Sequence, residues 1–184
     1  MAPRNKVEGR IYSFRSRAEC ADLGIAYPDL PKLVTCHMVF VLNWVPKRPG
    51  YVKVMTITSK ARPVGECIPI APTRKRPYPI QIHLQNGPEE NHPNGRIIYP
   101  TTLPKFSYLR IDSSYEIPLS VLKEANDYFG DQLMQRPKKT GGLGELRSYL
   151  RSMERSQQKQ GAITEELISA FGRQLLEDVV SQVP

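Results

Sequence analysis

The strongest pattern in the chain is a pair of apolar, β-rich runs joined by a short polar turn. Residues 38–42 (MVFVL) are almost continuously apolar, whereas residues 51–58 (YVKVMTIT) alternate between apolar and polar positions. β-Branched and aromatic residues at this density predict strands. The prolines and the glycine of residues 46–50 (PKRPG) supply turn chemistry between the two runs. We therefore predict a β-hairpin whose tip carries Lys47 and Arg48.

Shorter runs of the same kind lie before and after this hairpin. Further strands are predicted at residues 9–14, 67–70, 79–84, 96–99 and 106–111. Pro69 would place its strand at an edge, because proline cannot donate to a ladder of backbone hydrogen bonds. Residues 15–36 form a long connection with no clear period, in which residues 18–23 are a candidate short helix ended by Gly24. Many short strands separated by proline and glycine predict a mainly β fold, and the small size favours a barrel.

The period of the apolar positions changes near residue 116. A helix is predicted to open over residues 116–122, with Pro118 in its first turn, and to continue through Phe129 to a stop at Gly130. We thus expect a β-barrel domain over residues 1–130 and an α+β protein overall.

The last third of the chain has a different organisation. Residues 131–144 are predicted to be a basic, glycine-rich linker and residues 145–184 a helical tail. In the tail, residues 156–161 (SQQKQG) are expected to separate two helices, the second of which would be capped by Thr164. The second helix has a wide apolar face that must fold back on the barrel, dock a protein partner or form a homodimer. Its central residues are Ile168, Phe171, Leu175 and Val179.

Charge is distributed unevenly along the chain. Residues 1–123 carry 18 Lys and Arg against 9 Asp and Glu, a net +9, and residues 124–184 carry 8 against 9, a net −1, which together give the total of +8. A basic β domain is a candidate binder of polyanions, single-stranded RNA among them. The predicted nucleic-acid-binding residues are Lys47, Arg48, Lys60, Arg62, Arg74, Lys75 and Arg76. The alternative is that these side chains form an ordinary solvated surface.

Several other site classes have no support in the sequence. The cysteines and histidines show no metal-ligand spacing, and we see no glycine-rich phosphate loop and no paired carboxylates, so we expect no metal and no cofactor. No apolar run is long enough to span a membrane, and the first residues do not look like a secretory signal. We therefore expect an intracellular protein, cytoplasmic or nuclear, in which Cys20, Cys36 and Cys67 are free thiols.

The order of the predicted elements resembles the PemK/MazF-like family of small SH3-like barrels. Residues 9–14 (GRIYSF) look like the GDxxWxxF opening strand of that family, and residues 38–42 look like its RPxLVLS strand. Residues 55–60 (MTITSK) resemble its PITSK segment. Residues 107–111, followed by residues 117–119 and a helix, are similar to the end of the family fold, so that the resemblance covers residues 7–129.

The best-known members of this family are toxins that cleave RNA without a metal ion. The resemblance implies that Thr58 corresponds to the family's catalytic threonine. Where the family has its arginine, this chain has His37, and Arg17 in the long connection is another possible source of a cation. Because that arginine is missing, the leading hypothesis is an RNA- or protein-binding module. The alternatives are a metal-independent endoribonuclease that uses Thr58 and a small accessory protein of a multi-protein pathway.

Overall fold

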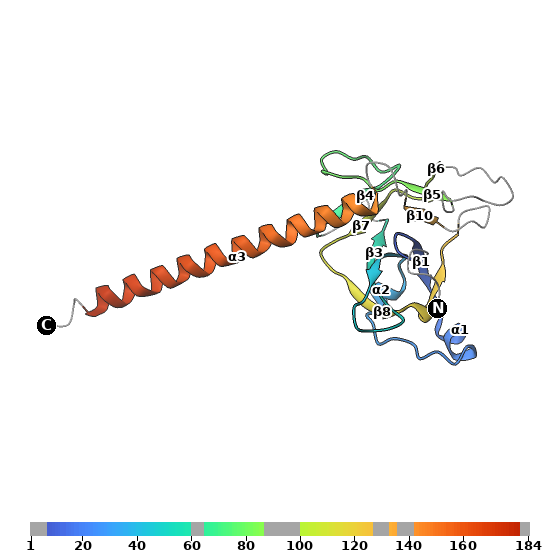
Figure 1. Cartoon of the computed structure of the whole chain (residues 1–184), viewed down its shortest axis with the longest axis horizontal. Coiled ribbons are helices and arrows are strands. Elements are labelled where there is room, and N and C mark those ends of the chain that lie inside the picture. Colours follow the sequence, from blue (N-terminus) through green and yellow to red (C-terminus); the bar gives the residue numbers. More distant parts are fainter. Residues whose placement is uncertain (1–6, 60–64, 87–99, 127–132, 136–141, 181–184) are drawn as a thin grey trace. The chain divides into compact units, whose positions relative to one another are not determined.

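A computed structural model of the chain describes residues 7–59, 65–86, 100–126, 133–135 and 142–180 (Figure 1). The chain divides into two compact units, Met1–Leu146 and Arg147–Pro184. The first unit is mainly β, as the sequence predicts, and the second belongs to one long helix.

The first unit is built on a seven-stranded antiparallel sheet. Its main path runs in the order β4-β7-β3-β2-β1-β9. Strand β7 pairs with the end of β3, and β8 pairs with the first half of β3. The strands are β1 (Ile11–Phe14), β2 (Val39–Trp44), β3 (Tyr51–Thr58), β4 (Cys67–Ile70), β7 (Ser107–Arg110), β8 (Tyr115–Pro118) and β9 (Leu122–Glu124). Within the described residues β4 and β9 do not pair with each other, so the observed sheet is open and the predicted closed barrel is not seen. A second, three-stranded sheet has the order β10-β5-β6 and contains β10 (Leu133–Gln135), β5 (Leu84–Asn86) and β6 (Pro100–Thr101).

The predicted central hairpin is confirmed by β2 and β3. The two strands pair from Val39 opposite Thr56 to Trp44 opposite Val52, with one irregularity in the register near Asn43. At the tip, Gly50 has a φ of 78°, a conformation that glycine adopts without steric cost. Both faces of the second half of β3 are buried.

The strands predicted at residues 9–14, 67–70 and 106–111 are confirmed by β1, β4 and β7. Strand β4 is the last in the sheet order, as Pro69 requires, and its only further partner within the described residues is an isolated parallel bridge to Ile82. Residues 80–84 keep the predicted alternation, with Ile80, Ile82 and Leu84 buried, although the strand β5 begins only at Leu84. The strand predicted at residues 96–99 lies outside the described residues.

The prediction of a helix that opens at residues 116–122 is wrong. This stretch instead forms β8, one 3-10 turn at Leu119–Val121 and β9. The first half of β3 has an open side that only β8 covers, and the pairing buries Ile117 opposite Val52. Tertiary pairing therefore overrides the helical spacing of the apolar residues. The predicted end of that helix, Phe129 and Gly130, lies outside the described residues.

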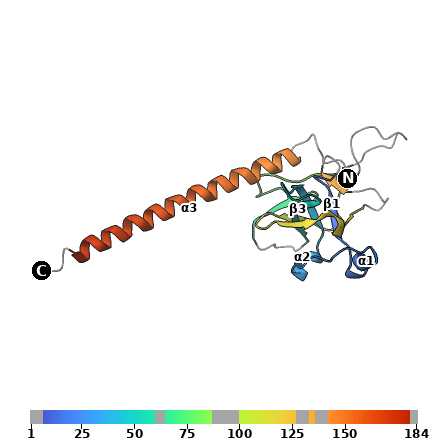
Figure 2. The same cartoon turned by 60° about the horizontal axis from the view of Figure 1, so that its bottom comes forward.

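The long connection between β1 and β2 contains two short helices, α1 (Arg17–Asp22) and α2 (Lys32–Thr35), near one another in both views (Figures 1 and 2). The first matches the candidate helix at residues 18–23. Ser16 and Glu19 cap it reciprocally: each side chain accepts a hydrogen bond from the backbone N–H of the other residue. Gly24 follows with a φ of 64°.

The last third differs from its predicted organisation in two ways. Part of the predicted linker, Leu133–Gln135, is strand β10. The tail is one continuous helix, α3 (Leu143–Val180), and not two helices. The Thr164 hydroxyl donates to the Gln160 carbonyl within the helix, so Thr164 is not a cap. Among the described residues, no helix combines the length and the apolarity needed to cross a membrane.

Candidate nucleic-acid interface

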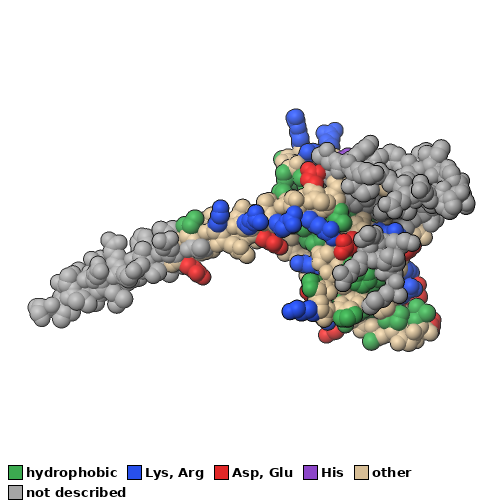
Figure 3. All heavy atoms as spheres, in the orientation of Figure 1, with side chains coloured by type: hydrophobic (Ala, Val, Ile, Leu, Met, Phe, Trp, Pro, Cys, Tyr) green, Lys and Arg blue, Asp and Glu red, His purple; other side chains and the backbone are tan. Residues whose placement is uncertain are grey.

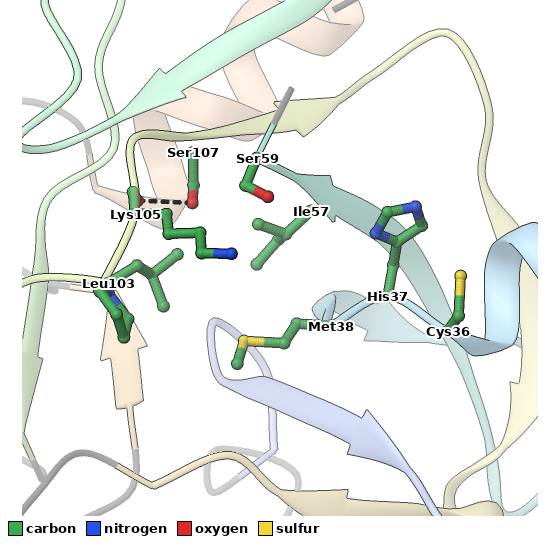
Figure 4. A pocket seen from close by; sticks show the side chains of 9 residues that line it. Cys36, His37, Met38, Ile57, Ser59, Leu103, Lys105 and Ser107 are labelled. Carbon is green, nitrogen blue, oxygen red and sulfur yellow. Dashed lines mark hydrogen bonds between the residues drawn. The ribbon is translucent and has the colours of Figure 1, made fainter. Parts of the chain in front are cut away.

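A hollow of about 280 Å³ lies at the open end of the β2–β3 hairpin, away from the tip (Figure 4). Ile57 and Ser59 at the end of β3 form one part of its wall. The segment that leads into β2 contributes a second part, held against β3 by a 2.8 Å hydrogen bond from the Ile57 N–H to the Met38 carbonyl. The segment before β7 closes the third side. The complete lining is Cys36, His37, Met38, Ile57, Ser59, Leu103, Pro104, Lys105 and Ser107.

The lining combines an apolar surface with a few polar groups. Figure 4 shows the side chains of Lys105 and His37 on either side of Ile57, with the Ser59 hydroxyl close by. The Ser107 hydroxyl is already used, because it donates to the Lys105 carbonyl over 2.8 Å. A cation, an imidazole and a hydroxyl therefore surround an apolar floor, which is the usual composition of a ligand site.

A second hollow adjoins the first. It is lined by Ser59, Pro72, Leu103, Pro104, Lys105 and Phe106, four of which also line the first hollow. We call the two hollows together the groove. Phe106 lies at its edge with 68% of its surface exposed, which is unusual for so large an apolar side chain. The groove thus offers an exposed aromatic ring on the residue that follows Lys105.

The predicted basic loop begins at the groove. Pro72 lines the second hollow, and the exposed residues Arg74, Lys75 and Arg76 follow it directly. Thr73 anchors this loop: its buried hydroxyl accepts a 2.8 Å hydrogen bond from the Ser107 N–H and donates over 3.1 Å to the Ser107 carbonyl. Gln81 holds the same residue from another side through a 2.6 Å bond from its amide nitrogen to the Thr73 carbonyl. Three cations are therefore attached to a fixed wall of the groove.

Two of the other predicted nucleic-acid-binding residues, Lys47 and Arg48, do not join this surface. Lys47 and Arg48 lie at the hairpin tip, at the opposite end of β2 and β3 from His37 and Ser59. The Arg48 guanidinium is 3.0 Å from a Glu116 carboxylate oxygen and 4.0 Å from the centre of the Tyr51 ring. Its charge is thus partly compensated. Lys60 and Arg62 lie outside the described residues.

The three predicted catalytic residues are not brought together. His37 lines the groove, but Thr58 is 5% exposed and points to the other face of β3 from Ile57 and Ser59. Arg17 lies on α1, where its guanidinium packs 4.8 Å from the centre of the Tyr27 ring. Neither Thr58 nor Arg17 belongs to the lining of the groove.

Sequence reasoning missed Lys105 and Phe106, which line the groove. Their only signal is a cation next to an aromatic residue directly after Pro104, a pattern too common to stand out without the fold. It also missed Ser59 as a lining residue, because the resemblance pointed to its neighbour Thr58.

Tyr78 and Cys67 have shifted pKa values. Burial raises the pKa of the Tyr78 hydroxyl, and the neighbouring Tyr108, whose ring centre is 5.9 Å away, raises it further. Burial also raises the pKa of the Cys67 thiol, as does the nearby Asp112 carboxylate. Both groups therefore stay neutral more readily than they would in water, and neither lines the groove.

Other kinds of site were considered over the part of the chain that the structure describes. No group of three or more His, Cys, Asp or Glu side chains there could hold a metal ion. Comparison of the chain with protein families, with curated proteins and with solved structures finds no match.

Proposed function

We propose that the first unit binds single-stranded RNA along the groove. The observation that carries this proposal is the anchoring of Thr73 on Ser107, which attaches the Arg74–Lys75–Arg76 loop to a wall shared with Lys105 and the exposed Phe106. Proteins that bind single strands combine cations along the backbone with aromatic rings that stack on bases. Both elements are present here on one surface.

Each part of the groove has a role in this proposal. Arg74, Lys75, Arg76 and Lys105 contact phosphates, and Phe106 stacks on a base. A neighbouring base enters the 280 Å³ hollow, where Met38, Ile57 and Leu103 contact its ring and His37 and Ser59 contact its polar edge. The net charge of +8 adds long-range attraction to a polyanion.

The test is fluorescence anisotropy with labelled polyuridine over a series of salt concentrations. Exchange of Arg74, Lys75 and Arg76 for Gln removes three phosphate contacts, so the slope of log affinity against log salt should fall by about 2. Phe106→Leu keeps an apolar side chain but removes the ring, and should weaken binding roughly fivefold or more, as loss of base stacking does.

Two lysines provide a matched control. Lys75 and Lys47 are both exposed loop residues, but they lie at opposite ends of the sheet. Lys75→Gln should reduce affinity and Lys47→Gln should not. Equal effects of the two changes would show that only total charge matters and would overturn the groove proposal.

The proposal also covers the fold family of the chain and its location in the cell. We propose an SH3-like barrel of the PemK/MazF-like type that works in the cytoplasm or nucleus. Two features support the family: the segment that resembles PITSK ends β3 at the groove, and His37 lies at the groove where the family has its arginine.

RNA cleavage without a metal ion is a second candidate function. One observation favours it: His37 and Lys105 line the same hollow, so an acid–base group and a cation share the proposed RNA surface. If the chain cleaves RNA, cleavage should persist in EDTA and disappear in His37→Gln. Thr58→Ala tests the role that the resemblance implies for Thr58. Intact RNA after long incubation with the unmodified protein would exclude this function.

For the tail we propose association with a second copy. A single helix is only marginally stable in water unless its apolar face is covered. The predicted contact residues Ile168, Phe171, Leu175 and Val179 lie on α3, where only the backbone is described. Phe171→Glu should shift the mass measured by light scattering from dimer to monomer, whereas Arg173→Gln should not. A monomeric unmodified protein would contradict the proposal.

A further inference from the structure

The helix α3 carries a regular row of cations in the second unit. Arg147, Arg151, Arg155 and Lys159 follow one another at intervals of four residues. Four residues of α-helix correspond to a rise of about 6 Å and a net rotation of about 40°, so the row covers about 18 Å of the helix while turning about 120° around it. Figure 3 shows Lys and Arg side chains in succession along α3. Residues 124–184 have a net charge of −1, so their composition alone does not reveal this row of cations.

Three of the four cations of this row are exposed to a ligand. Arg151, Arg155 and Lys159 are exposed, and within the described residues none of the three has an ion pair. One carboxylate, Glu154, lies between the first and last cation in sequence. Around the helix axis, Glu154 lies about 20° from Arg147 on the side away from Lys159, and so at the margin of the row.

The hydroxyl groups of the neighbouring serines already form hydrogen bonds within the helix. The Ser152 hydroxyl donates to the Tyr149 carbonyl over 2.7 Å, and the Ser156 hydroxyl donates to the Ser152 carbonyl over 2.9 Å. Ser148 accepts a 3.2 Å hydrogen bond from Arg151, which holds that guanidinium along the helix. The row is therefore a set of charged donors on a regular backbone.

A regular row of separated cations fits a ligand with regularly spaced anionic groups. We infer that the Arg147–Lys159 face of α3 is a second phosphate-binding surface, which contacts the phosphodiester backbone of a nucleic acid independently of the groove. Lysine and arginine contacts of this kind hold the backbone and do not select a sequence.

The sequence around the row argues against an anionic membrane as the ligand. A helix that lies on a membrane inserts an apolar face beside its cations. From Glu154 to Gly161 the helix contains no apolar side chain, so half of the row has no such face. A nucleic acid requires only the charges.

The test is the exchange of Arg151, Arg155 and Lys159 for Gln in the full-length protein. Gln has nearly the same helix propensity as Arg and Lys, so circular dichroism should show unchanged helix content. The salt slope for labelled polyuridine should fall by about 2, because three phosphate contacts are lost. Arg151→Lys with Arg155→Lys preserves the charges and should preserve the slope.

The experiments can reject the groove proposal and the proposal for the row of cations independently of each other. If the Gln exchange on α3 lowers the slope but the exchange of Arg74, Lys75 and Arg76 does not, the row is supported and the groove proposal is overturned. Unchanged affinity and slope in the α3 variant would overturn the present inference.

Two further results would also overturn it. One is loss of binding to phosphatidylserine vesicles in the α3 variant with RNA binding intact. The other is a change in mass by light scattering with RNA binding intact, which would assign the row to the acidic residues of a second copy.

Discussion

The Thr73 hydroxyl contacts both backbone polar groups of Ser107, accepting from its N–H and donating to its carbonyl. The two residues are 34 positions apart, and the contact is buried. It joins the basic loop that follows β4 to the segment that leads into β7. This hydroxyl, together with the Gln81 amide that donates to the Thr73 carbonyl, therefore helps to fix the proposed RNA-binding cations relative to the groove.

Removal of that hydroxyl should destabilise the first unit. Thr73→Val keeps the shape of the side chain but leaves the Ser107 N–H and carbonyl without their partner, at a cost of about 1–3 kcal/mol in the free energy of unfolding. Urea denaturation measures this change. Thr73→Ser keeps the hydroxyl and should recover most of the loss. Equal losses in the two variants would mean that the methyl group, and not the hydrogen bonds, matters.

Two glycines of the first unit should respond differently to the same substitution. Gly24 and Gly65 have φ values of 64° and 92°, so alanine is strained at both. A Cβ at Gly24 meets nothing within 4 Å, whereas a Cβ at Gly65 collides with the Asp112 carboxylate, which is ion-paired to Arg110 at 2.7 Å.

Gly24→Ala should therefore cost about 1 kcal/mol from the backbone alone. Gly65→Ala should cost more, roughly 2–4 kcal/mol, because Asp112 must move or its pair with Arg110 must break. Thermal or urea unfolding of the two variants side by side measures the difference. A Gly65 variant as stable as the Gly24 variant would show that Asp112 moves freely.

The three thiols should differ in reactivity. Cys36 is exposed and lines the groove, whereas Cys20 and Cys67 are buried. Burial also raises the pKa of the Cys67 thiol, which leaves less of the reactive thiolate. Iodoacetamide should therefore label Cys36 first, and mass spectrometry of peptides identifies the labelled residue.

RNA in the groove should protect Cys36. Saturating polyuridine should slow the alkylation of Cys36. The alkylation rate of Cys36 in the unfolded protein serves as the reference. Alkylation at the same rate with and without bound RNA would place the RNA elsewhere on the molecule.

Acid should weaken the contact between α1 and β9. Hydrogen bonds from the Ser16 backbone N–H, the Lys123 ammonium and the Ser16 hydroxyl lower the pKa of Glu19 from its ordinary value of 4.5 to about 2. Because the folded state holds the carboxylate charged, Glu19 stabilises the fold fully above pH 4.5. That contribution is lost as the pH falls from 4.5 toward 2.

The difference in unfolding free energy between the unmodified protein and Glu19→Gln should therefore shrink over this interval. In NMR titrations Lys123→Gln should raise the pKa of Glu19, and Lys47→Gln should leave it unchanged. A difference between the proteins that is constant from neutral pH to pH 2 would contradict the assignment.

The local features of the chain were readable from the sequence. The β2–β3 hairpin, the edge position of Pro69, the short helix before Gly24 and the alternation at residues 80–84 all match their predictions. Each depends on neighbouring residues: a two-residue apolar period, a missing backbone donor or a residue suited to positive φ. Such signals act over a few positions and do not need the rest of the fold.

One error arose where a distant segment decides the outcome, and another where neighbouring residues outweigh a local signal. The apolar spacing from Leu119 onward predicts a helix that opens at residues 116–122, but residues 115–118 form β8 because they pair with the open side of β3. In the tail, Gly161 was read as part of a break, yet the surrounding residues continue one helix through it. A glycine in a helix costs only about 1 kcal/mol, which favourable neighbours can offset.

By itself the sequence determined that the first part of this protein is a basic, mainly β unit with cations at residues 74–76, because period and composition are properties of short segments. Only the tertiary structure decided which cations share a surface. It separated Lys47 and Arg48 from the basic loop, turned Thr58 away from the groove and brought Lys105 and Phe106 to its edge. The physical reason is that a functional surface forms where strand pairing and buried hydrogen bonds such as Thr73–Ser107 join segments far apart in the chain.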